Sequence, residues 1–308
     1  MKSIFILHPG KANYPEIEAY KKYFAGQYKV EDGGIADYEA LPNKSEIIVW
    51  CIMGFFPKSL KAKVVIHDYR SLSVGQMPAL KDFVKRGLNS KPNIRIFQND
   101  IMRAKMSFKD KVPSYLLPMG VPDFISNVSP HVDETLSSDF CYIGEMSYER
   151  GFDKMLDAFL TNASHSQLTL IGTPEDKILN KYGLNKCLNF IGRKSQQETL
   201  SIVKASKYAI CFFPYHRPHC FQAPTKLLEY MALGVRIVCN DSPSNLRTAE
   251  EFNYPCFFTG PNIFDFPELE SSLASYSTDF SRSDKRIKAI DWHSVISESG
   301  IDAVLQSF

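Results

Sequence analysis

The chain has 308 residues, of which 44% are hydrophobic and 23% charged, with a formal net charge of +2. These proportions are typical of globular proteins, and the length is sufficient for two domains that each bury a core. No apolar run approaches the roughly 20 residues that a membrane-spanning helix needs, so no spanning helix is expected.

The charge is unevenly distributed along the chain. Residues 1–137 carry 19 Lys and Arg against 14 Asp and Glu, whereas residues 138–308 carry 17 against 20. A basic first half suits contact with an anionic membrane surface or an anionic acceptor. The alternative is an ordinary solvated surface of mixed charge. We expect no nucleic-acid partner.

The cysteines and the N-terminus bear on the compartment. The seven cysteines are scattered without a C-x-x-C pair, which favours reduced thiols over disulfides and gives no zinc-ligand spacing. The opening sequence MKSIFILHPG has too short an apolar run for a secretion signal and is typical of a first strand. We therefore expect a cytoplasmic protein, with the inner face of the membrane as a candidate peripheral contact.

In the first half, short apolar runs alternate with helical patterns. The expected strands are 3–7, 46–51, 63–67, 94–98 and 115–118, and the expected helices are 14–24, 78–86 and 100–108. This alternation predicts an α/β domain with a parallel sheet covered on both faces. Ligands of such sheets bind beyond the carboxyl ends of the strands, which selects the loops 8–11, 54–56 and 67–70. No G-x-G-x-x-G follows the first strand, so a dinucleotide cofactor is not expected.

The second half repeats this scheme after a polar stretch, 126–138, which we interpret as a linker. Its expected strands are 140–144, 167–172, 188–192, 208–213 and 235–239, and its expected helices are 151–160, 196–205, 224–233 and 295–305.

The helix expected at 224–233 carries the main site hypothesis. Pro224 suits a first turn, and Gly234 is placed to end the helix. Lys226 and Glu229 are three residues apart, so they share one face near a helix start, where N–H groups and the helix dipole favour anions. The pair suits a phosphate and a sugar hydroxyl. The alternative is a solvated Lys–Glu pair on an amphipathic helix.

The sequence PTKLLEYMALGVRIV at 224–238 resembles the P-x-K-x-x-E-Y-x-A-x-G-x-x-V segment of retaining GT-B glycosyltransferases, especially glycosyltransferase family 4. The segments VVIHDYRS, FCYIGEMSYERGFDKMLDAF, LTLIGTPED and LNFIGRKSQQETLSIVKASKYAI resemble other motifs of that family. The resemblance implies two Rossmann-like domains with parallel sheets that face each other across a cleft. It implies an acceptor domain at 1–125, the linker at 126–138, a nucleotide-sugar donor domain at 139–290, and a C-terminal helix, 291–308, that crosses back to the first domain.

The resemblance also implies roles for individual residues. In the family, cations grip the donor diphosphate, a glutamate binds the nucleotide ribose, and a histidine lies beside the donor sugar. The corresponding catalytic candidates are His67, Arg150, Lys226 and Glu229, and the donor-binding candidates are Gly10, Lys11, Gly192, Arg193, Gln222 and Thr225. For His67 the alternative is a histidine at the edge of the core, and for Arg193 it is a surface cation. The loop residues His216, Arg217 and His219 either contact the donor or are solvated.

Two positions depart from the family pattern. Glu145 occupies the place of the family's arginine, which removes an expected positive charge near the diphosphate. Gln222 occupies the place of the first of two glutamates, and an amide hydrogen-bonds a hydroxyl but carries no charge.

The resemblance implies a retaining glycosyltransferase that moves a sugar from a nucleotide-diphosphate donor to a glycan or lipid-linked acceptor, in bacterial surface polysaccharide or lipopolysaccharide synthesis. The nucleotide sugar is a substrate and no cofactor is expected. No Asp-x-Asp motif is present, so we expect no metal. The alternatives are a nucleotide-sugar 2-epimerase, a catalytically silent GT-B module, and a carbohydrate-binding protein without a nucleotide site.

Overall fold

The computed structural model describes residues 2–10, 14–130, 138–265, 269–276 and 285–308. The chain forms two compact units. Unit 1 comprises Met1–Pro122, Phe221–Ala223 and Asp291–Phe308, and unit 2 comprises Asp123–Cys220 and Pro224–Ile290. The short segment Phe221–Ala223 thus belongs to the first unit although the residues on either side of it belong to the second.

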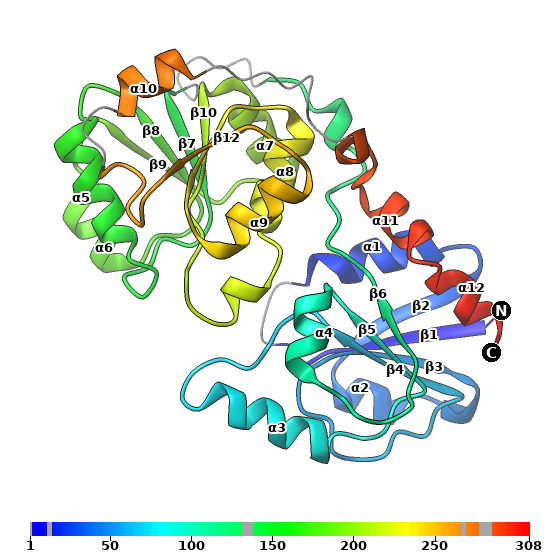
Figure 1. Ribbon diagram of the computed structural model, residues 1–308. Coiled ribbons are helices and arrows are strands. Elements are labelled where there is room, and N and C mark those ends of the chain that lie inside the picture. The colour runs from blue at the N-terminus through cyan, green and yellow to red at the C-terminus, as the bar shows by residue number, and fades with distance from the viewer. Residues whose placement is uncertain (1, 11–13, 131–137, 266–268, 277–284) are drawn as a thin grey trace. The chain divides into compact units, whose positions relative to one another are not determined.

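Unit 1 is built on a six-stranded parallel sheet with the order β2-β1-β3-β4-β5-β6 (Figure 1). The strands are β1 (Lys2–Leu7), β2 (Tyr28–Gly33), β3 (Ile48–Ile52), β4 (Val64–Tyr69), β5 (Ile94–Phe97) and β6 (Ser114–Leu116). The helices are α1 (Pro15–Phe24), α2 (Ile35–Ala40), α3 (Pro78–Leu88), α4 (Asp100–Met106), α11 (Trp292–Glu298) and α12 (Ile301–Gln306).

The centre of the unit 1 sheet is buried on both faces. Every residue of β3 and β4 is buried, as expected of parallel strands covered by helices. Helix α1 packs against α11, and the Tyr20 ring contacts both Trp50 and Trp292. A Cβ on Gly120 would lie 2.7 Å from the Trp292 ring, so this indole packs directly against the backbone. Trp292 is thus an apolar anchor for the C-terminal segment.

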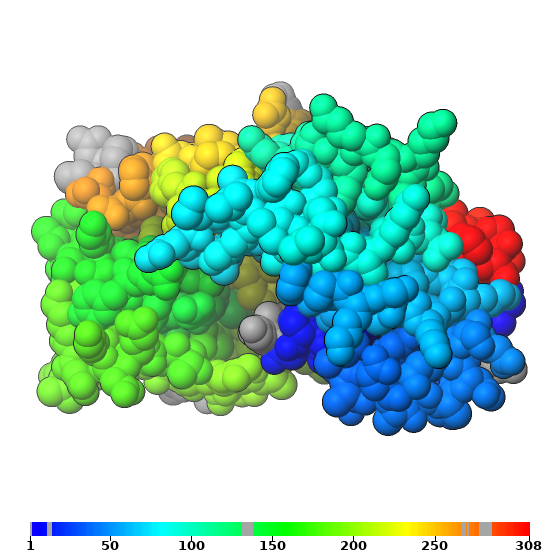
Figure 2. All heavy atoms as spheres, turned by 90° about the horizontal axis from the view of Figure 1, so that it is seen from below, coloured from blue at the N-terminus to red at the C-terminus, as the bar shows by residue number. Residues whose placement is uncertain are grey.

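Helix α3 differs from the other helices of unit 1. Asp82 is its only buried residue, and most of its apolar side chains are exposed. The segment that contains α3, coloured cyan, forms part of the surface seen in Figure 2.

Unit 2 has a second six-stranded parallel sheet with the order β12-β11-β10-β7-β8-β9. The strands are β7 (Phe140–Ile143), β8 (Leu168–Ile171), β9 (Leu188–Gly192), β10 (Tyr208–Cys211), β11 (Ile237–Asn240) and β12 (Cys256–Thr259). The helices are α5 (Phe152–Asn162), α6 (Asp176–Tyr182), α7 (Gln196–Ala205), α8 (Thr225–Leu233), α9 (Pro243–Glu251) and α10 (Leu269–Ser275). The rings of Phe140, Phe159 and Phe264 meet edge to face in its core.

Some local details differ from the sequence prediction. Pro224 is the N-cap of α8 and not its first helical residue, whereas Gly234 ends the helix at φ +69° as predicted. The helix predicted at 295–305 is two helices, because Gly300 adopts φ +68° between α11 and α12. In the predicted linker, 131–137 lie outside the described residues. No helix in the described part of the chain is long and apolar enough to span a bilayer.

Candidate functional site

The candidate site lies at the carboxyl edge of the unit 2 sheet. Strands β7 and β10 are neighbours at its centre, and the chain leaves them toward opposite sides, with β8 and β9 on one side and β11 and β12 on the other. In open parallel sheets ligands bind at such a switch point. The loops that leave β7 and β10 therefore form the expected binding place, and α8 follows directly from the second of them.

The start of α8 holds an ordered ion pair. Lys226 Nζ lies 2.8 Å from Glu229 Oε2, and Gln196 Nε2 donates to the other carboxylate oxygen at 3.0 Å. The Glu229 side chain is 7% exposed and that of Lys226 is 37% exposed. A surface pair between two solvated groups was the alternative, but a carboxylate this buried does not fit it. The lysine keeps an accessible face, while the glutamate is fixed from two sides.

The loop after β7 contains the second cation. Arg150 Nη2 lies 2.9 Å from Glu145 Oε2, so the glutamate at the family's arginine position is paired with the arginine at its lysine position. The Glu145 backbone is held in turn, because Tyr142 Oη donates to its carbonyl oxygen at 2.9 Å. Both charged side chains remain partly open to solvent. An incoming phosphate would have to compete with Glu145 for the guanidinium.

The loop after β10 brings a neutral histidine to the same place. Burial, together with the nearby charges of Arg150 and His216, lowers the pKa of His219 to about 4, against an opposing effect of Glu145. Ser244 Oγ donates to the His219 carbonyl at 2.8 Å, which fixes the backbone. At neutral pH the imidazole is therefore uncharged and presents one donor and one acceptor, a combination suited to sugar hydroxyls.

The loops after β7, β8 and β9 are in backbone contact. A Cβ on Gly172 would lie 2.1 Å from the Gly144 carbonyl oxygen, so only glycine fits there. The Gly172 N–H also donates to the Gly192 carbonyl at 3.0 Å. Gly192 has φ +72°, Arg193 after it is exposed, and Thr225 is the first residue of α8. These three predicted donor contacts thus lie on the carboxyl edge of the sheet.

Four of the predicted residues belong to unit 1, namely His67, Gly10, Lys11 and Gln222. His67 lies inside β4 and is 1% exposed, with its Nε2 unpartnered. Burial, and to a smaller degree Arg95, lowers the pKa of His67 to about 3. This burial agrees with the alternative of a histidine at the edge of the core, and a contact of the ring with a sugar stays a prediction. Gly10 has φ +69° in the loop after β1, and Lys11 lies outside the described residues.

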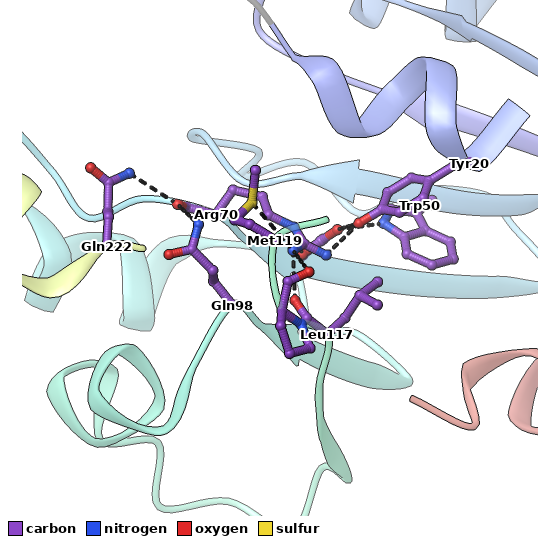
Figure 3. Close-up of polar contacts among 9 residues, drawn as sticks. Tyr20, Trp50, Arg70, Gln98, Leu117, Met119 and Gln222 are labelled. Carbon is purple, nitrogen blue, oxygen red and sulfur yellow. Dashed lines mark hydrogen bonds and ion pairs between the residues drawn. The ribbon is translucent and has the colours of Figure 1, made fainter. Parts of the chain in front are cut away.

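Gln222 makes its contacts within unit 1. Its Nε2 donates to the Arg70 carbonyl oxygen at 3.1 Å, as Figure 3 shows. The neighbouring Ala223 N–H donates to Gln98 Oε1 at 2.8 Å, and Gln98 Nε2 reaches the same Arg70 carbonyl at 3.5 Å. Gln222 is therefore an anchor of its own segment here, and a role in donor binding stays a prediction.

A buried polar network at the end of β4 was not predicted. Asp68 is fully buried and pairs with Arg70 Nε at 2.8 Å, and it accepts hydrogen bonds from Tyr20 Oη at 2.8 Å and Trp50 Nε1 at 2.9 Å. Arg70 also donates to the Leu117 carbonyl at 2.7 Å (Figure 3). The residues of this network are too far apart in sequence to form a motif. The opposite charges of Asp68 and Arg70 at the end of a predicted strand could nevertheless have indicated a buried ion pair.

Among the described residues no group of three or more His, Cys, Asp and Glu side chains could hold a metal ion.

Comparisons with known proteins agree with this architecture. Residues 131–268 match the family of glycosyl transferases group 1. That segment contains all six strands of the unit 2 sheet and the whole of α8. Comparison with curated protein sequences gives no significant match. The chain as a whole has the GT-B fold, an α/β fold with two parallel sheets.

Three solved structures illustrate the likeness. HepE (Alr3699) of Anabaena in complex with UDP and glucose is 12% identical, with a TM-score of 0.65 and 100% of both chains covered. Sucrose-phosphate synthase of Thermosynechococcus elongatus is 13% identical, with a TM-score of 0.66 and 100% of both chains covered. A putative UDP-N-acetylglucosamine 2-epimerase of Listeria monocytogenes is 10% identical, with a TM-score of 0.58, covering 100% of this chain and 97% of that one.

Proposed function

We propose that this protein is a retaining, metal-independent glycosyltransferase that uses a nucleotide-diphosphate sugar. The observation that carries the proposal is the start of α8, where a half-open lysine and a buried, doubly held carboxylate stand within the segment that matches the glycosyl transferases group 1. Helix starts favour anions through their N–H groups and dipole. A diphosphate at Lys226 would be neutralised by the ammonium group, and a ribose at Glu229 would donate its hydroxyl hydrogen bonds to the carboxylate.

The leaving group needs positive charge that is already in place. In the transfer the acceptor hydroxyl bonds to the anomeric carbon while the bond from that carbon to the diphosphate oxygen breaks, and the hydroxyl proton passes to the departing phosphate. Negative charge therefore builds on the diphosphate. Lys226, Arg150 and the N–H groups of α8 are the groups that would stabilise it. Among the described residues no side chain is an evident nucleophile, so attack on the face that the diphosphate leaves is the mechanism that we propose.

Glu229 would bind the ribose and not act on the sugar. Its carboxylate accepts hydrogen bonds only, so ribose hydroxyls would donate to it. Gln196 and Lys226 already orient both oxygens, which keeps the carboxylate in one position before the nucleotide arrives. His219, neutral at physiological pH, would contact the sugar or the phosphate without adding charge.

The proposal also covers the nucleotide of the donor and the class of the acceptor. HepE binds UDP, so uridine diphosphate is the first nucleotide to try. The acceptor is a glycan or a lipid-linked glycan, and surface polysaccharide or lipopolysaccharide synthesis is the pathway that the sequence resemblance implies. A cytoplasmic location agrees with that pathway and is part of the same prediction.

A nucleotide-sugar 2-epimerase is the second candidate, because a protein with that putative name shares the fold. The two functions differ in their need for an acceptor. An epimerase converts or cleaves its nucleotide sugar alone, whereas a transferase turns over slowly until an acceptor is added.

Thermal unfolding with UDP, GDP, TDP and CMP would identify the nucleotide, since a ligand at 100 times its Kd stabilises the folded state by about 2.7 kcal/mol. Release of the nucleotide from matching sugar donors, with and without an acceptor mixture, then separates the candidates. Stabilisation by a nucleotide without any turnover would indicate a silent module. No stabilisation by any nucleotide would contradict the proposed function and favour a carbohydrate-binding protein.

A further inference from the structure

Helix α3 carries its apolar side chains on the outside. Asp82 is its only buried residue. The apolar residues of the helix and its N-cap are largely solvent-exposed: Met77 is 67% exposed, Leu80 49%, Phe83 62%, Val84 40% and Leu88 58%. An amphipathic helix at a protein surface normally shows the opposite pattern, with its apolar stripe toward the core. The stripe of α3 therefore has no partner within the described residues.

Polar contacts hold the helix in this orientation. The Asp82 carboxylate accepts the Ser73 N–H at 3.0 Å, and Arg86 Nη1 donates to the Met106 carbonyl at 2.9 Å. With 3.6 residues per turn, the exposed apolar residues span an arc of about 140° centred opposite Asp82. The Asp82 carboxylate, which binds the helix to the rest of unit 1, thus lies on the side opposite the apolar stripe. Its contact with Ser73 therefore keeps the stripe facing outward.

Basic residues border the stripe. On the helix, Lys81 and Lys85 follow one edge of the arc and Arg86 the other. Residues 55–91 contain eight Lys and Arg but only two acidic residues, Asp68 and Asp82, and both of these are buried. Within this segment the accessible charge is therefore of one sign, while the neighbouring helix α4 adds the exposed pair of Asp100 and Arg103.

The neighbouring loop extends the same surface. Phe55 is 50% exposed, and the next residue, Phe56, is tied to the end of α3, because its N–H donates to Asn89 Oδ1 at 2.8 Å and its carbonyl accepts from the Ser90 N–H at 3.0 Å. Lys58 in this loop is exposed. We call the exposed apolar residues of α3 with Phe55 and the surrounding cations the α3 surface.

We propose that the α3 surface docks on an anionic lipid bilayer, with α3 lying in the plane of the headgroups. An apolar arc bordered by Lys and Arg on a helix is the arrangement by which interfacial helices bind lipid. Each cation near an anionic leaflet adds to the attraction. A second copy of the chain suits the surface less, because a symmetric pair would bring the same cations together. The proposal does not depend on glycosyl transfer.

Co-sedimentation with vesicles tests the proposal on the full chain. We expect it to pellet with vesicles of phosphatidylcholine and phosphatidylglycerol, and less with phosphatidylcholine alone, with binding that weakens as salt is added. The double variant Phe83→Ser/Leu88→Ser should lower partitioning on the mixed vesicles at least about tenfold. Lys81→Gln/Lys85→Gln should lower it about tenfold on the mixed vesicles and leave binding to phosphatidylcholine unchanged.

Leu184→Ser is the matched control, because Leu184 is a 99% exposed leucine of unit 2 and does not belong to the α3 surface. It should bind the mixed vesicles as the unchanged chain does. The proposal is overturned if the unchanged chain stays in solution with the mixed vesicles, or if Leu184→Ser reduces binding as much as the α3 variant. It is equally overturned if light scattering shows a dimer that Phe83→Ser/Leu88→Ser converts to a monomer, since the occupant is then a second copy.

Discussion

Lys226 and Glu229 form a pair in which only the lysine is open to solvent: their side chains are 37% and 7% exposed and their charged atoms are 2.8 Å apart. The glutamate has a second partner in Gln196, at 3.0 Å. The pair therefore combines a cation that a ligand can reach with a carboxylate whose position is set in advance. Its two members should respond differently to mutation.

Lys226→Ala should abolish turnover while the fold is retained. Removing one preorganised charge from a developing anion costs about a hundredfold or more in rate. Donor turnover is measured alongside thermal unfolding, so that loss of activity is separated from loss of structure. The matched control is Lys181→Ala, which removes an exposed lysine paired with Asp157 elsewhere in unit 2. A Lys226→Ala enzyme close to the unchanged rate would show that the diphosphate binds elsewhere.

Glu229→Gln should act on donor binding more than on the chemical step. The amide oxygen can still accept from Gln196, but the ribose hydroxyls lose a charged acceptor and Lys226 loses its counterion. We expect KM for the donor to rise about tenfold with a smaller change in kcat. Steady-state kinetics over a range of donor concentrations measure both constants. A fall in kcat at unchanged KM would mean that this carboxylate acts in the transition state, contrary to the proposed ribose contact.

Glu145→Gln should tighten the binding of a nucleotide diphosphate. Glu145 Oε2 lies 2.9 Å from Arg150 Nη2, and removing the charge of this carboxylate leaves the guanidinium free to pair with the phosphates. Exposed pairs of this kind contribute up to about 1 kcal/mol, which corresponds to an increase in affinity of up to about fivefold. Isothermal titration with the nucleotide measures the change, and added salt should reduce it. Glu149→Gln, at an exposed neighbouring position, is the control, and an equal effect there would mean a general charge effect.

Much of the fold and part of the site follow from local sequence patterns. Most strands of the two sheets are short apolar runs, and Pro224 and Gly234 predict the start and end of α8 to within one residue. Such features depend on residues within one or two turns of each other. Strand β2 was missed because YKVEDG carries three charges, which the edge of a sheet tolerates.

The features that could not be predicted join distant parts of the chain. The Asp68 carboxylate is satisfied by Tyr20 and Trp50, which are 48 and 18 residues away. The burial of His67 depends on its place in β4 between the neighbouring strands β3 and β5. The sequence of one strand does not show which of its residues these neighbours cover. The orientation of α3 likewise follows from Asp82 accepting the Ser73 N–H, a contact that the helical pattern does not show.

Buried His67 should make the protein less stable in acid. Its pKa in the folded state is about 3, below the ordinary value of 6.5, because burial disfavours the charged form. The unfolded chain therefore binds a proton that the folded chain does not, so this contribution to stability is complete above pH 6.5 and is lost as the pH falls toward 3. Between pH 7 and pH 4.5 the loss is on the order of 2 kcal/mol.

His67→Phe, which keeps an aromatic ring of similar size, should remove that part of the pH dependence. Urea unfolding at pH 7 and pH 4.5 measures it, and His165→Asn, at an exposed position, should leave the pH dependence unchanged. If His67→Phe and the unchanged protein lose the same free energy of unfolding on acidification, then His67 is not the group responsible.

Turnover should be independent of divalent metal ions. The chain has no Asp-x-Asp motif, and two cations near the proposed diphosphate contact, Lys226 and Arg150, can take the place of a metal in stabilising the leaving group. We expect full donor turnover in excess chelator and no increase when Mg²⁺ or Mn²⁺ is added. Lys226→Ala serves as the internal comparison, since a metal-using enzyme would retain part of its rate without the lysine. Activity that disappears with chelator and returns with Mg²⁺ would instead place a metal ion at the diphosphate.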